Sequence, residues 1–434
     1  MTSTFTEEFD DLGNVISVAD IEFTDDVLGE GSFGIVRLAR RNSKSKLKDS
    51  KRLGKLTSSS ITCASNISSF RSGGEIWNSI DENSSVGGKE KKKRMKKWKN
   101  DGNKDKTNLM ETNLMAVKIY SKSALKRMRE ITKSTSAKRR LSIHTALEKV
   151  EKEISIMKMM NHPNLVKLHK VIDSIESDTL YVVMEYLPLG QIMTFNPETL
   201  RYSQTNKSVY GVTKDDFFEE EAAALYFVDL LNGLRHLHKH HICHRDLKPD
   251  NILIDSRGFA KISDFGVSFL FETENSLKQL DPSTLSGSLK KREGTYSFWS
   301  PEMCSANSEE FSGYASDLWA CGICLFIFVT GKLPFYAFSP VELFELITDS
   351  APAKPVDVEF SSCLDDLLMR LLQKDPDVRA TIKEGLVHPF CKAAGKQRNV
   401  LLESNTDWKQ EKESSLSSLR HSFKSKHPST CILQ

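Results

Sequence analysis

The sequence of 434 residues lacks the features of a secreted or membrane-spanning chain. Its first residues contain neither the basic stretch nor the apolar stretch that a secretion signal combines. No window has the uninterrupted apolar length that a membrane span requires. These absences predict a cytoplasmic or nuclear protein.

Cysteine and net charge are also low. The eight cysteines show no disulfide-framework spacing, and the net charge is only +3. One Cys-x-x-Cys, Cys321 to Cys324, lies in the apolar stretch Leu318 to Val329 without a second ligand pair. We therefore interpret that pair as part of a buried helix rather than a zinc or redox site, and we expect no specific nucleic-acid partner.

The sequence contains an octapeptide, His-Arg-Asp-Leu-Lys-Pro-Asp-Asn, from His244 to Asn251, followed later by Asp264-Phe265-Gly266. Phosphoryl transfer from ATP needs a carboxylate that orients the accepting hydroxyl, a cation near the phosphoryl group and oxygen ligands for Mg²⁺. Asp246 and Lys248 are the candidate catalytic residues, and Asn251 and Asp264 the candidate metal ligands.

These motifs resemble the eukaryotic protein kinase family. The resemblance implies an α+β fold of two lobes, a small N-lobe with an antiparallel sheet and a larger helical C-lobe. It also implies ATP and Mg²⁺ as cofactors. The rival class is a non-catalytic kinase-fold scaffold, which would have lost Lys118, Asp246 or Asp264, and all three are present.

A glycine-rich stretch, Gly29 to Gly34, lies between two strand-like segments. Glycines at these spacings let backbone amides approach phosphate oxygens, although they also serve tight hairpins. A dinucleotide-binding fold would need a helix next, and residues 35–39 are strand-like instead. The resemblance implies Met184 as gatekeeper and the ATP-binding residues Leu28, Gly29, Glu30, Gly31, Ser32, Phe33, Gly34, Val36, Ala116, Lys118, Glu153, Glu185 and Leu187.

The pairing of Lys118 with Glu153 has support from periodicity. Glu153 falls within the apolar stripe of a predicted helix, where a carboxylate is costly unless it has a partner. The resemblance makes Lys118 that partner. Two other acids of the helix, Glu148 and Glu151, fall on its polar faces.

The domain boundaries follow from changes in composition. We expect a flexible acidic tail at 1–20 and a kinase domain at 21–391, with the N-lobe at 21–187 and the C-lobe at 188–391. The remaining segments are expected to lack regular structure: a polar insert at 42–110, a basic stretch at 122–140, a loop at 194–216 and a C-terminal tail at 392–434. Gln191 is placed on a helix after the hinge.

The basic run Lys89 to Lys99 allows three interpretations. It is a nuclear address, a segment that binds anionic lipid or nucleic acid, or a solvated linker.

Lys248 and Thr295 match serine/threonine kinases. Several segments, among them residues 150–157 and 161–168, resemble the calcium/calmodulin-dependent protein kinase kinase group. That group phosphorylates the activation loops of other kinases, which implies protein substrates, other kinases among them. Residues 414–426 are a short version of a calmodulin-binding helix.

The activation segment departs from the common pattern. Thr295 and Glu302 match its substrate-facing end, and Arg379 matches the arginine that pairs with Glu302. Residues 289–293 hold no serine or threonine where many kinases are phosphorylated, and we expect Glu293 to pair with Arg245 instead. Ser286 and Ser288 are the fallback phosphorylation sites.

The last four residues, Cys431-Ile432-Leu433-Gln434, form a prenylation motif of the type that is usually farnesylated. The alternative is a chance match. One isoprenoid binds membranes only marginally, so Arg420, Lys424 and Lys426 would add an electrostatic signal of about 1 kcal/mol each at an anionic surface. We expect reversible attachment to the cytoplasmic face of a membrane.

The lipid anchor is tested by replacing Cys431. Wild-type protein should carry a farnesyl mass and distribute partly to the membrane fraction, and Cys431→Ser should lose both because no thiol remains to alkylate. Intact-mass measurement and cell fractionation check this. Equal distribution of the two proteins between the fractions, with no added mass on the wild type, would contradict the predicted lipid anchor.

Overall fold

The computed structural model describes residues 7–10, 15–31, 33–42, 113–133, 141–271, 288–305, 310–356 and 358–404. The chain forms two compact units, one comprising Met1–Phe5, Thr24–Ala39 and Met115–Gln434 and the other Thr6–Phe23 and Arg40–Leu114. Predictions for Ser32, residues 43–110, Ser286 and Cys431 with the rest of 405–434 fall outside the described residues.

The smaller unit contains strands where a flexible tail was expected. β1 (Glu7–Phe9) pairs antiparallel with β2 (Val15–Val18), and β2 pairs with the start of β3 (Ile21–Gly31). Val18 lies opposite Ile21 across the turn, and both side chains are buried. The prediction of a tail over 1–20 is therefore wrong for these strands, which are too short to show a periodicity.

The N-lobe of the larger unit is built on an antiparallel sheet. In this unit the neighbouring strands run in the order β3, β4 (Gly34–Arg41), β5 (Leu114–Ser121), β9 (Thr179–Glu185), β8 (Leu168–Asp173). In the β5–β9 pair, Lys118 lies opposite Val182. The β-branched and aromatic residues of β9 are almost all buried, as expected for a central strand.

Between β5 and β8 lie the elements that support the sheet. They are α3 (Lys122–Arg127), the antiparallel hairpin of β6 (Arg129–Lys133) and β7 (Leu141–Thr145), and α4 (Ala146–Met159). The Thr145 side chain accepts a hydrogen bond from the Glu148 backbone amide and begins α4. The basic stretch 122–140 is thus not simply a loop, since α3 and β6 occupy its first part.

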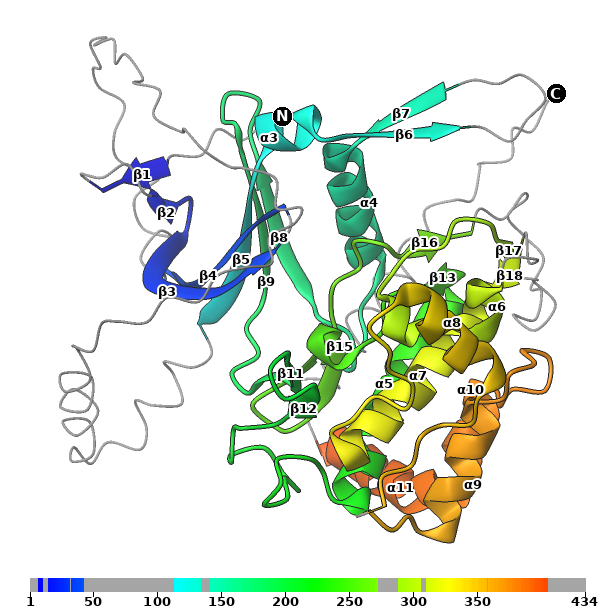
Figure 1. The fold of residues 1–434 in the computed structure, drawn as a ribbon. Helices are drawn as coiled ribbons and strands as arrows, with labels where there is room; N and C mark the ends of the chain where they lie inside the picture. The colour runs from blue at the N-terminus through cyan, green and yellow to red at the C-terminus, as the bar shows by residue number, and fades with distance from the viewer. Residues whose placement is uncertain are drawn as a thin grey trace, which may run out of the picture. The chain divides into compact units, whose positions relative to one another are not determined.

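The C-lobe is mainly helical, so the predicted α+β architecture with a larger helical lobe is confirmed (Figure 1). Its helices are α5 (Glu220–Lys239), α6 (Pro301–Cys304), α7 (Gly313–Thr330), α8 (Pro340–Asp349), α9 (Ser362–Leu371), α10 (Ile382–Val387) and α11 (Pro389–Ser404). Its short strands and 3₁₀ turns are β10 (Gly190–Gln191), β11 (Thr194–Asn196), β12 (Arg201–Ser203), β13 (Ile242–Cys243), η2 (Pro249–Asn251), β14 (Ile252–Ile254), β15 (Ala260–Ile262), β16 (Phe269–Leu270), β17 (Ser288–Leu289), η4 (Tyr296–Phe298) and β18 (Phe311–Ser312).

Helix α7 is the centre of this lobe and lies beside α5 (Figure 1). It is long and apolar enough to cross a membrane, but 89% of it is buried inside the protein. A helix that is apolar all round belongs in a core, and Cys321 and Cys324 are buried in it as predicted. Gly331 ends α7 with a φ of 66°, a left-handed conformation that glycine adopts without a Cβ penalty.

The segment after the hinge differs from the prediction. Gln191 lies on strand β10, paired with Leu253 of β14, rather than on a helix. Gly190 before it has a φ of 74°, which is incompatible with an α-helical start. The predicted loop at 194–216 contains the β11–β12 hairpin, in which Phe195 lies opposite Tyr202.

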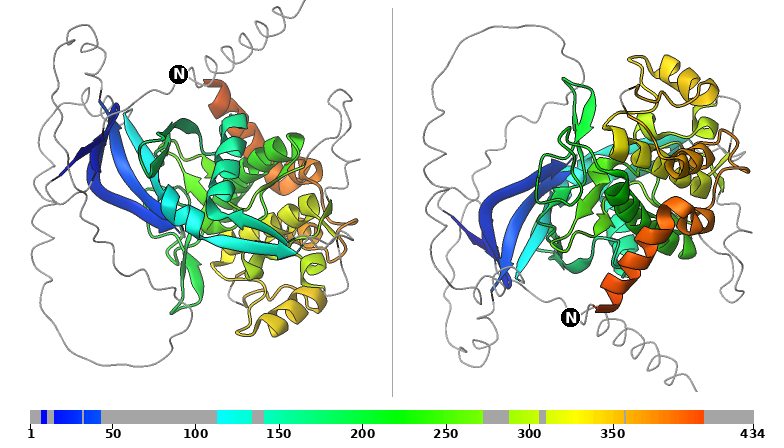
Figure 2. Two further views of the ribbon diagram at one scale, coloured as in Figure 1. Left: turned by 90° about the horizontal axis from the view of Figure 1, so that it is seen from above. Right: turned by 90° about the horizontal axis from the view of Figure 1, so that it is seen from below.

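The helical lobe extends past residue 391, so the predicted boundary there is too early. Helix α11 packs along α5, as both views of Figure 2 show. The Arg398 guanidinium lies 2.7 Å from the Asp229 carboxylate of α5, and both side chains are buried. Burial raises the pKa of Asp229 to about 7, although Arg398 lowers it, so this carboxylate depends on the guanidinium to remain ionised.

Removing the Arg398 charge should destabilise the lobe. Arg398→Met leaves a buried carboxylate without its cation and should lower the free energy of unfolding by about 3–5 kcal/mol. The double variant Asp229→Asn with Arg398→Met should lose less of its free energy of unfolding, because no unpaired buried charge remains. Urea unfolding measures both, with Lys392→Met on the exposed face of α11 as the control. An Arg398→Met protein as stable as that control would contradict the account.

Candidate functional site

The catalytic loop places the Asp246 carboxylate within a ring of donors. Its Oδ1 accepts hydrogen bonds from the backbone amide and the hydroxyl of Thr295, both at 2.9 Å. Its Oδ2 lies 2.9 Å from Lys248 Nζ and accepts a 3.1 Å hydrogen bond from Asn251 Nδ2. Burial alone would raise the pKa of Asp246, but Lys248 and Thr295 hold it below its ordinary value, so the carboxylate is charged at neutral pH.

Gly294 makes this approach sterically possible. Its φ is 100°, and a Cβ at this position would lie 2.3 Å from the Arg245 carbonyl oxygen. Only glycine therefore lets the backbone bring Thr295 to Asp246. The structure thus joins two residues, Asp246 and Thr295, that are far apart in the sequence.

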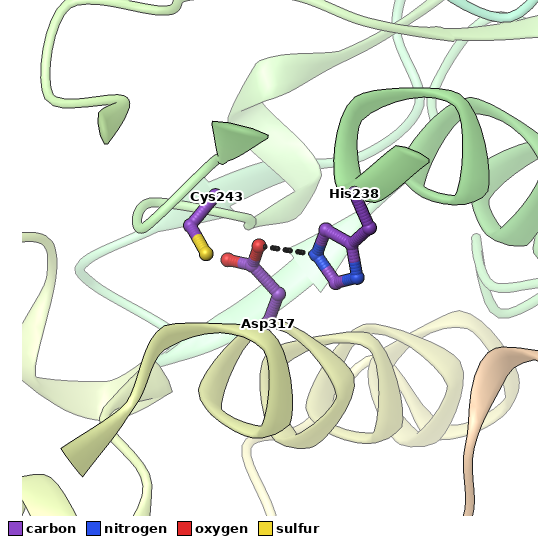
Figure 3. Close-up of side chains that lie close together, drawn as sticks. All are labelled: His238, Cys243 and Asp317. Atoms are coloured by element: carbon purple, nitrogen blue, oxygen red, sulfur yellow. Dashed lines mark hydrogen bonds and ion pairs between the residues drawn. The ribbon is translucent and has the colours of Figure 1, made fainter. Parts of the chain in front are cut away.

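Asp317 of α7 fixes the start of the catalytic loop through hydrogen bonds. Its two carboxylate oxygens accept 2.9 Å hydrogen bonds from the backbone amides of His244 and Arg245. His238 of α5 lies 2.8 Å from the same carboxylate, and Figure 3 shows the imidazole pointing at it beside Cys243. Asp317 thus ties the first two residues of the catalytic loop to helix α7.

His238, Cys243 and Asp317 also have the spacing of metal ligands, with their donor atoms within 4.8 Å of one another. Two features argue for a structural link instead. Both Asp317 oxygens are already engaged by backbone amides, and burial raises the pKa of the Cys243 thiol well above its ordinary value. A protonated thiol is a poor zinc ligand.

Lys118 and Glu153 meet as the sequence predicted. Lys118 Nζ of β5 lies 3.3 Å from Glu153 Oε1 of α4, and both side chains are mostly buried. Burial would lower the pKa of Lys118, but Glu153, Tyr120 and Asp264 raise it above its ordinary value. The ammonium group is therefore charged, and Asp264 is near enough to contribute to this.

Asn251 and Asp264 are suited to a hard cation. Asn251 Nδ2 is occupied by the Asp246 carbonyl and carboxylate at 2.8 and 3.1 Å, which leaves its amide oxygen to act as a ligand. Asp264 is exposed, has a φ of 60°, and accepts only a long 3.3 Å hydrogen bond from the Gly266 amide within the described residues. Two such oxygen donors fit Mg²⁺.

The glycine-rich stretch forms the β3–β4 hairpin. Gly29 faces open space, and a Cβ on Gly31 would make an ordinary contact, 3.7 Å from the Gly34 carbonyl oxygen. A Cβ on Gly34 would lie 2.2 Å from the Ile119 carbonyl oxygen of β5. Leu28 and Glu30 are exposed on β3, as is Phe33 in the turn, while Val36 is half-buried on β4. Open backbone at the tip of a hairpin is accessible to phosphate oxygens.

The hinge contains an ion pair that the sequence did not indicate. The Glu185 carboxylate lies 2.8 and 2.6 Å from Lys261 Nζ of β15, and it also accepts the Lys167 amide at 2.6 Å. Glu185 follows Met184, which lies opposite Ala116 in the sheet, and Leu187 is buried nearby. The pair joins the last strand of the N-lobe to the C-lobe, and neither charge stands out in a periodic pattern.

Arg245 has an acidic partner in the activation segment. Its Nη1 lies 2.9 Å from Glu293 Oε2, and its Nη2 donates a 2.5 Å hydrogen bond to the Lys291 carbonyl oxygen. The guanidinium is 6% exposed and Glu293 19%, so the pair is shielded from water. The expected pairing of Arg245 with Glu293 is confirmed.

The far end of the activation segment is held by a second ion pair. Arg379 Nη1 and Nη2 each lie 2.8 Å from an oxygen of Glu302, a bidentate arrangement. Lys248 Nζ also donates a 2.9 Å hydrogen bond to the Thr295 hydroxyl, a contact that sequence spacing does not reveal. Glu302 thus anchors the segment in which Thr295 contacts the Asp246 carboxylate.

Comparison with known proteins identifies relatives for most of this site. A family model described as protein kinase domain matches residues 107–391, which is more than half of the chain. The match begins after the glycine-rich stretch, and the site residues from Ala116 to Glu302 lie within it.

Individual relatives are similar over the same region. Serine/threonine-protein kinase TOS3 of Saccharomyces cerevisiae is 33% identical over 272 residues, covering 60% of this chain and 47% of the relative. Serine/threonine-protein kinase GRIK2 of Arabidopsis thaliana is 33% identical over 276 residues, or 63% and 58% of the two chains. The calcium/calmodulin-dependent protein kinase kinase of Caenorhabditis elegans is 34% identical over 254 residues, or 58% and 42%. The chain spans between 35% and 58% of the length of these and similar curated relatives.

Proposed function

Because the chain belongs to the protein kinase family, we propose that it transfers the γ-phosphate of ATP to serine or threonine hydroxyls of protein substrates. The observation that carries the proposal is the charged Asp246 carboxylate, held by Thr295 and Lys248 at the mouth of the catalytic loop. A scaffold without catalysis would have no need for that arrangement. Lys118, Asp246 and Asp264 are all present, and Asp264 is near enough to Lys118 to raise its pKa.

Each residue has one role in the transfer. Asp246 orients the substrate hydroxyl and accepts its proton as the oxygen attacks. Lys248, bonded to both Asp246 and Thr295, neutralises charge on the transferring phosphoryl group. Asn251 and Asp264 would hold Mg²⁺, which supplies charge neutralisation on the phosphates when it is bound.

Residues of the N-lobe and the hinge would bind the nucleotide. Lys118, oriented by Glu153, would bind the α- and β-phosphates. The backbone of Glu185 and Leu187 would bond the adenine edge, and the backbone of Gly29 and Gly31 would cover the phosphates. The Lys261 ion pair fixes Glu185 and hence the hinge backbone.

We further propose that the substrates are other protein kinases, phosphorylated on their activation loops. The support is similarity to relatives that include a calcium/calmodulin-dependent protein kinase kinase, whose name states that it acts on another kinase. The Lys248 and Thr295 pair is consistent with serine or threonine as the acceptor.

The activity is tested by removing one charge at a time. Lys118→Met, Asp246→Asn and Asp264→Ala should each lower phosphoryl transfer by at least about 100-fold without unfolding the protein, because each removes a transition-state interaction rather than core packing. Transfer of labelled γ-phosphate and thermal unfolding measure the two effects, with the exposed Asp215→Asn as the control. Wild-type turnover by Asp246→Asn would overturn the assignment.

The Arg245 and Glu293 pair predicts activity without phosphorylation of the activation loop. Phosphatase-treated enzyme should remain active, and Glu293→Gln should lower kcat about tenfold because Arg245 loses its charged partner and the segment shifts. Glu310→Gln is the control, since Glu310 pairs with Lys290 in the same region without touching Arg245. Loss of activity on phosphatase treatment, with phosphate mapped to Ser286 or Ser288, would contradict the prediction.

A further inference from the structure

We propose that an exposed apolar and acidic surface around α8 docks the protein substrate at a place separate from the residues that surround the accepting hydroxyl. This α8 surface is defined by Tyr296, Tyr336, Phe338, Val341, Glu342 and Glu345. The inference rests on the proposed kinase activity, because its occupant is the protein that receives the phosphate.

The α8 surface exposes large side chains that normally avoid water. Phe338 is 88% exposed, Val341 67% and Tyr296 49%. The Tyr336 and Phe338 rings lie edge to face with their centroids 5.5 Å apart. Clustered apolar exposure of this kind marks an interaction site, whereas single exposed residues do not.

The surface stands on a rigid platform. Helix α8 starts with a proline in its first turn and buries Leu343 and Ile347 against the lobe. On its flank Phe344 stacks on Trp299 with ring centroids 5.5 Å apart and planes within 9°. A binding partner would therefore meet side chains that are already positioned, which reduces the entropy lost on association.

The surface is continuous with the place where the hydroxyl must lie. Thr295 makes two 2.9 Å hydrogen bonds to Asp246, and Tyr296 is the next residue. The Tyr296 ring lies 4.7 Å from Trp299 and 5.6 Å from Phe344 of α8, centroid to centroid. A protein whose hydroxyl reaches Asp246 thus has its neighbouring surface against Tyr296 and, beyond it, α8.

The charge of the surface indicates the chemistry of the partner. Glu342 and Glu345 are exposed on α8, and neither forms an ion pair within the described part of the chain. The complementary surface is a folded region with apolar side chains beside lysine or arginine. Residues 414–426 of this chain combine the same residue types, so they are the competing occupant.

The experiment compares two substrates with the full chain as enzyme. One is a calcium/calmodulin-dependent protein kinase made inactive by mutation, and the other is a short peptide with its activation-loop acceptor. Phe338→Ala and Glu345→Lys should each raise KM for the protein about tenfold at unchanged kcat, because a docking contact binds ground state and transition state equally. KM for the peptide should change by less than about twofold. Ile175→Ala, 94% exposed between β8 and β9, and Glu403→Lys on α11 are the matched controls.

The outcomes separate the possibilities. An unchanged KM for the protein in both α8 variants, or equal changes for protein and peptide, would overturn the docking site while leaving the kinase activity intact. A lower KM in Phe338→Ala, reproduced by ending the chain at Ser404, would assign the surface to residues 414–426 instead. No transfer to either substrate by wild-type enzyme would contradict the proposed function and the docking site with it.

Discussion

The geometry of the site depends on one buried carboxylate. Asp317, at the start of the core helix α7, accepts the backbone amides of His244 and Arg245 and the side chain of His238. A carboxylate has enough lone pairs for all three donors, and inside the lobe these charge-assisted hydrogen bonds are not weakened by water. Because the amides belong to the two residues before Asp246, the position of the Asp246 carboxylate is set by α7, in which almost every residue is buried.

Outward from this anchor, charges of opposite sign are paired across elements that are distant in sequence. Glu153 fixes Lys118, Glu293 fixes Arg245, and Glu302 fixes Arg379. Each pair is largely buried, so the loss of one partner would leave the other charge buried and unpaired. The pairs therefore set the arrangement of strand β5, the catalytic loop and the activation segment. Asp264 is exposed and forms no ion pair within the described residues, so its carboxylate is available to a cation.

Much of the site could be predicted because its residues stand out in short, local sequence patterns. Glu153 stood out because it interrupts an apolar stripe at helical spacing, and the catalytic loop stood out because its residue types follow one another in eight positions. Resemblance supplied Arg379 as the partner of Glu302. Two ion pairs between distant residues were missed because neither has a local sequence signal: Arg398 with Asp229, which extends the lobe past 391, and Glu185 with Lys261. Strands β1 and β2 were missed because each has only three or four residues.

The central claim is that Asp317 positions the catalytic loop, and hydrogen exchange in an Asp317→Asn variant tests it most directly. Asparagine offers one acceptor oxygen and adds a donor that faces a backbone amide, so the amides of His244 and Arg245 should exchange at least about tenfold faster. Amides within α5 should keep their protection, and phosphoryl transfer should fall about 100-fold. Unchanged protection of the two amides together with full activity would contradict the account.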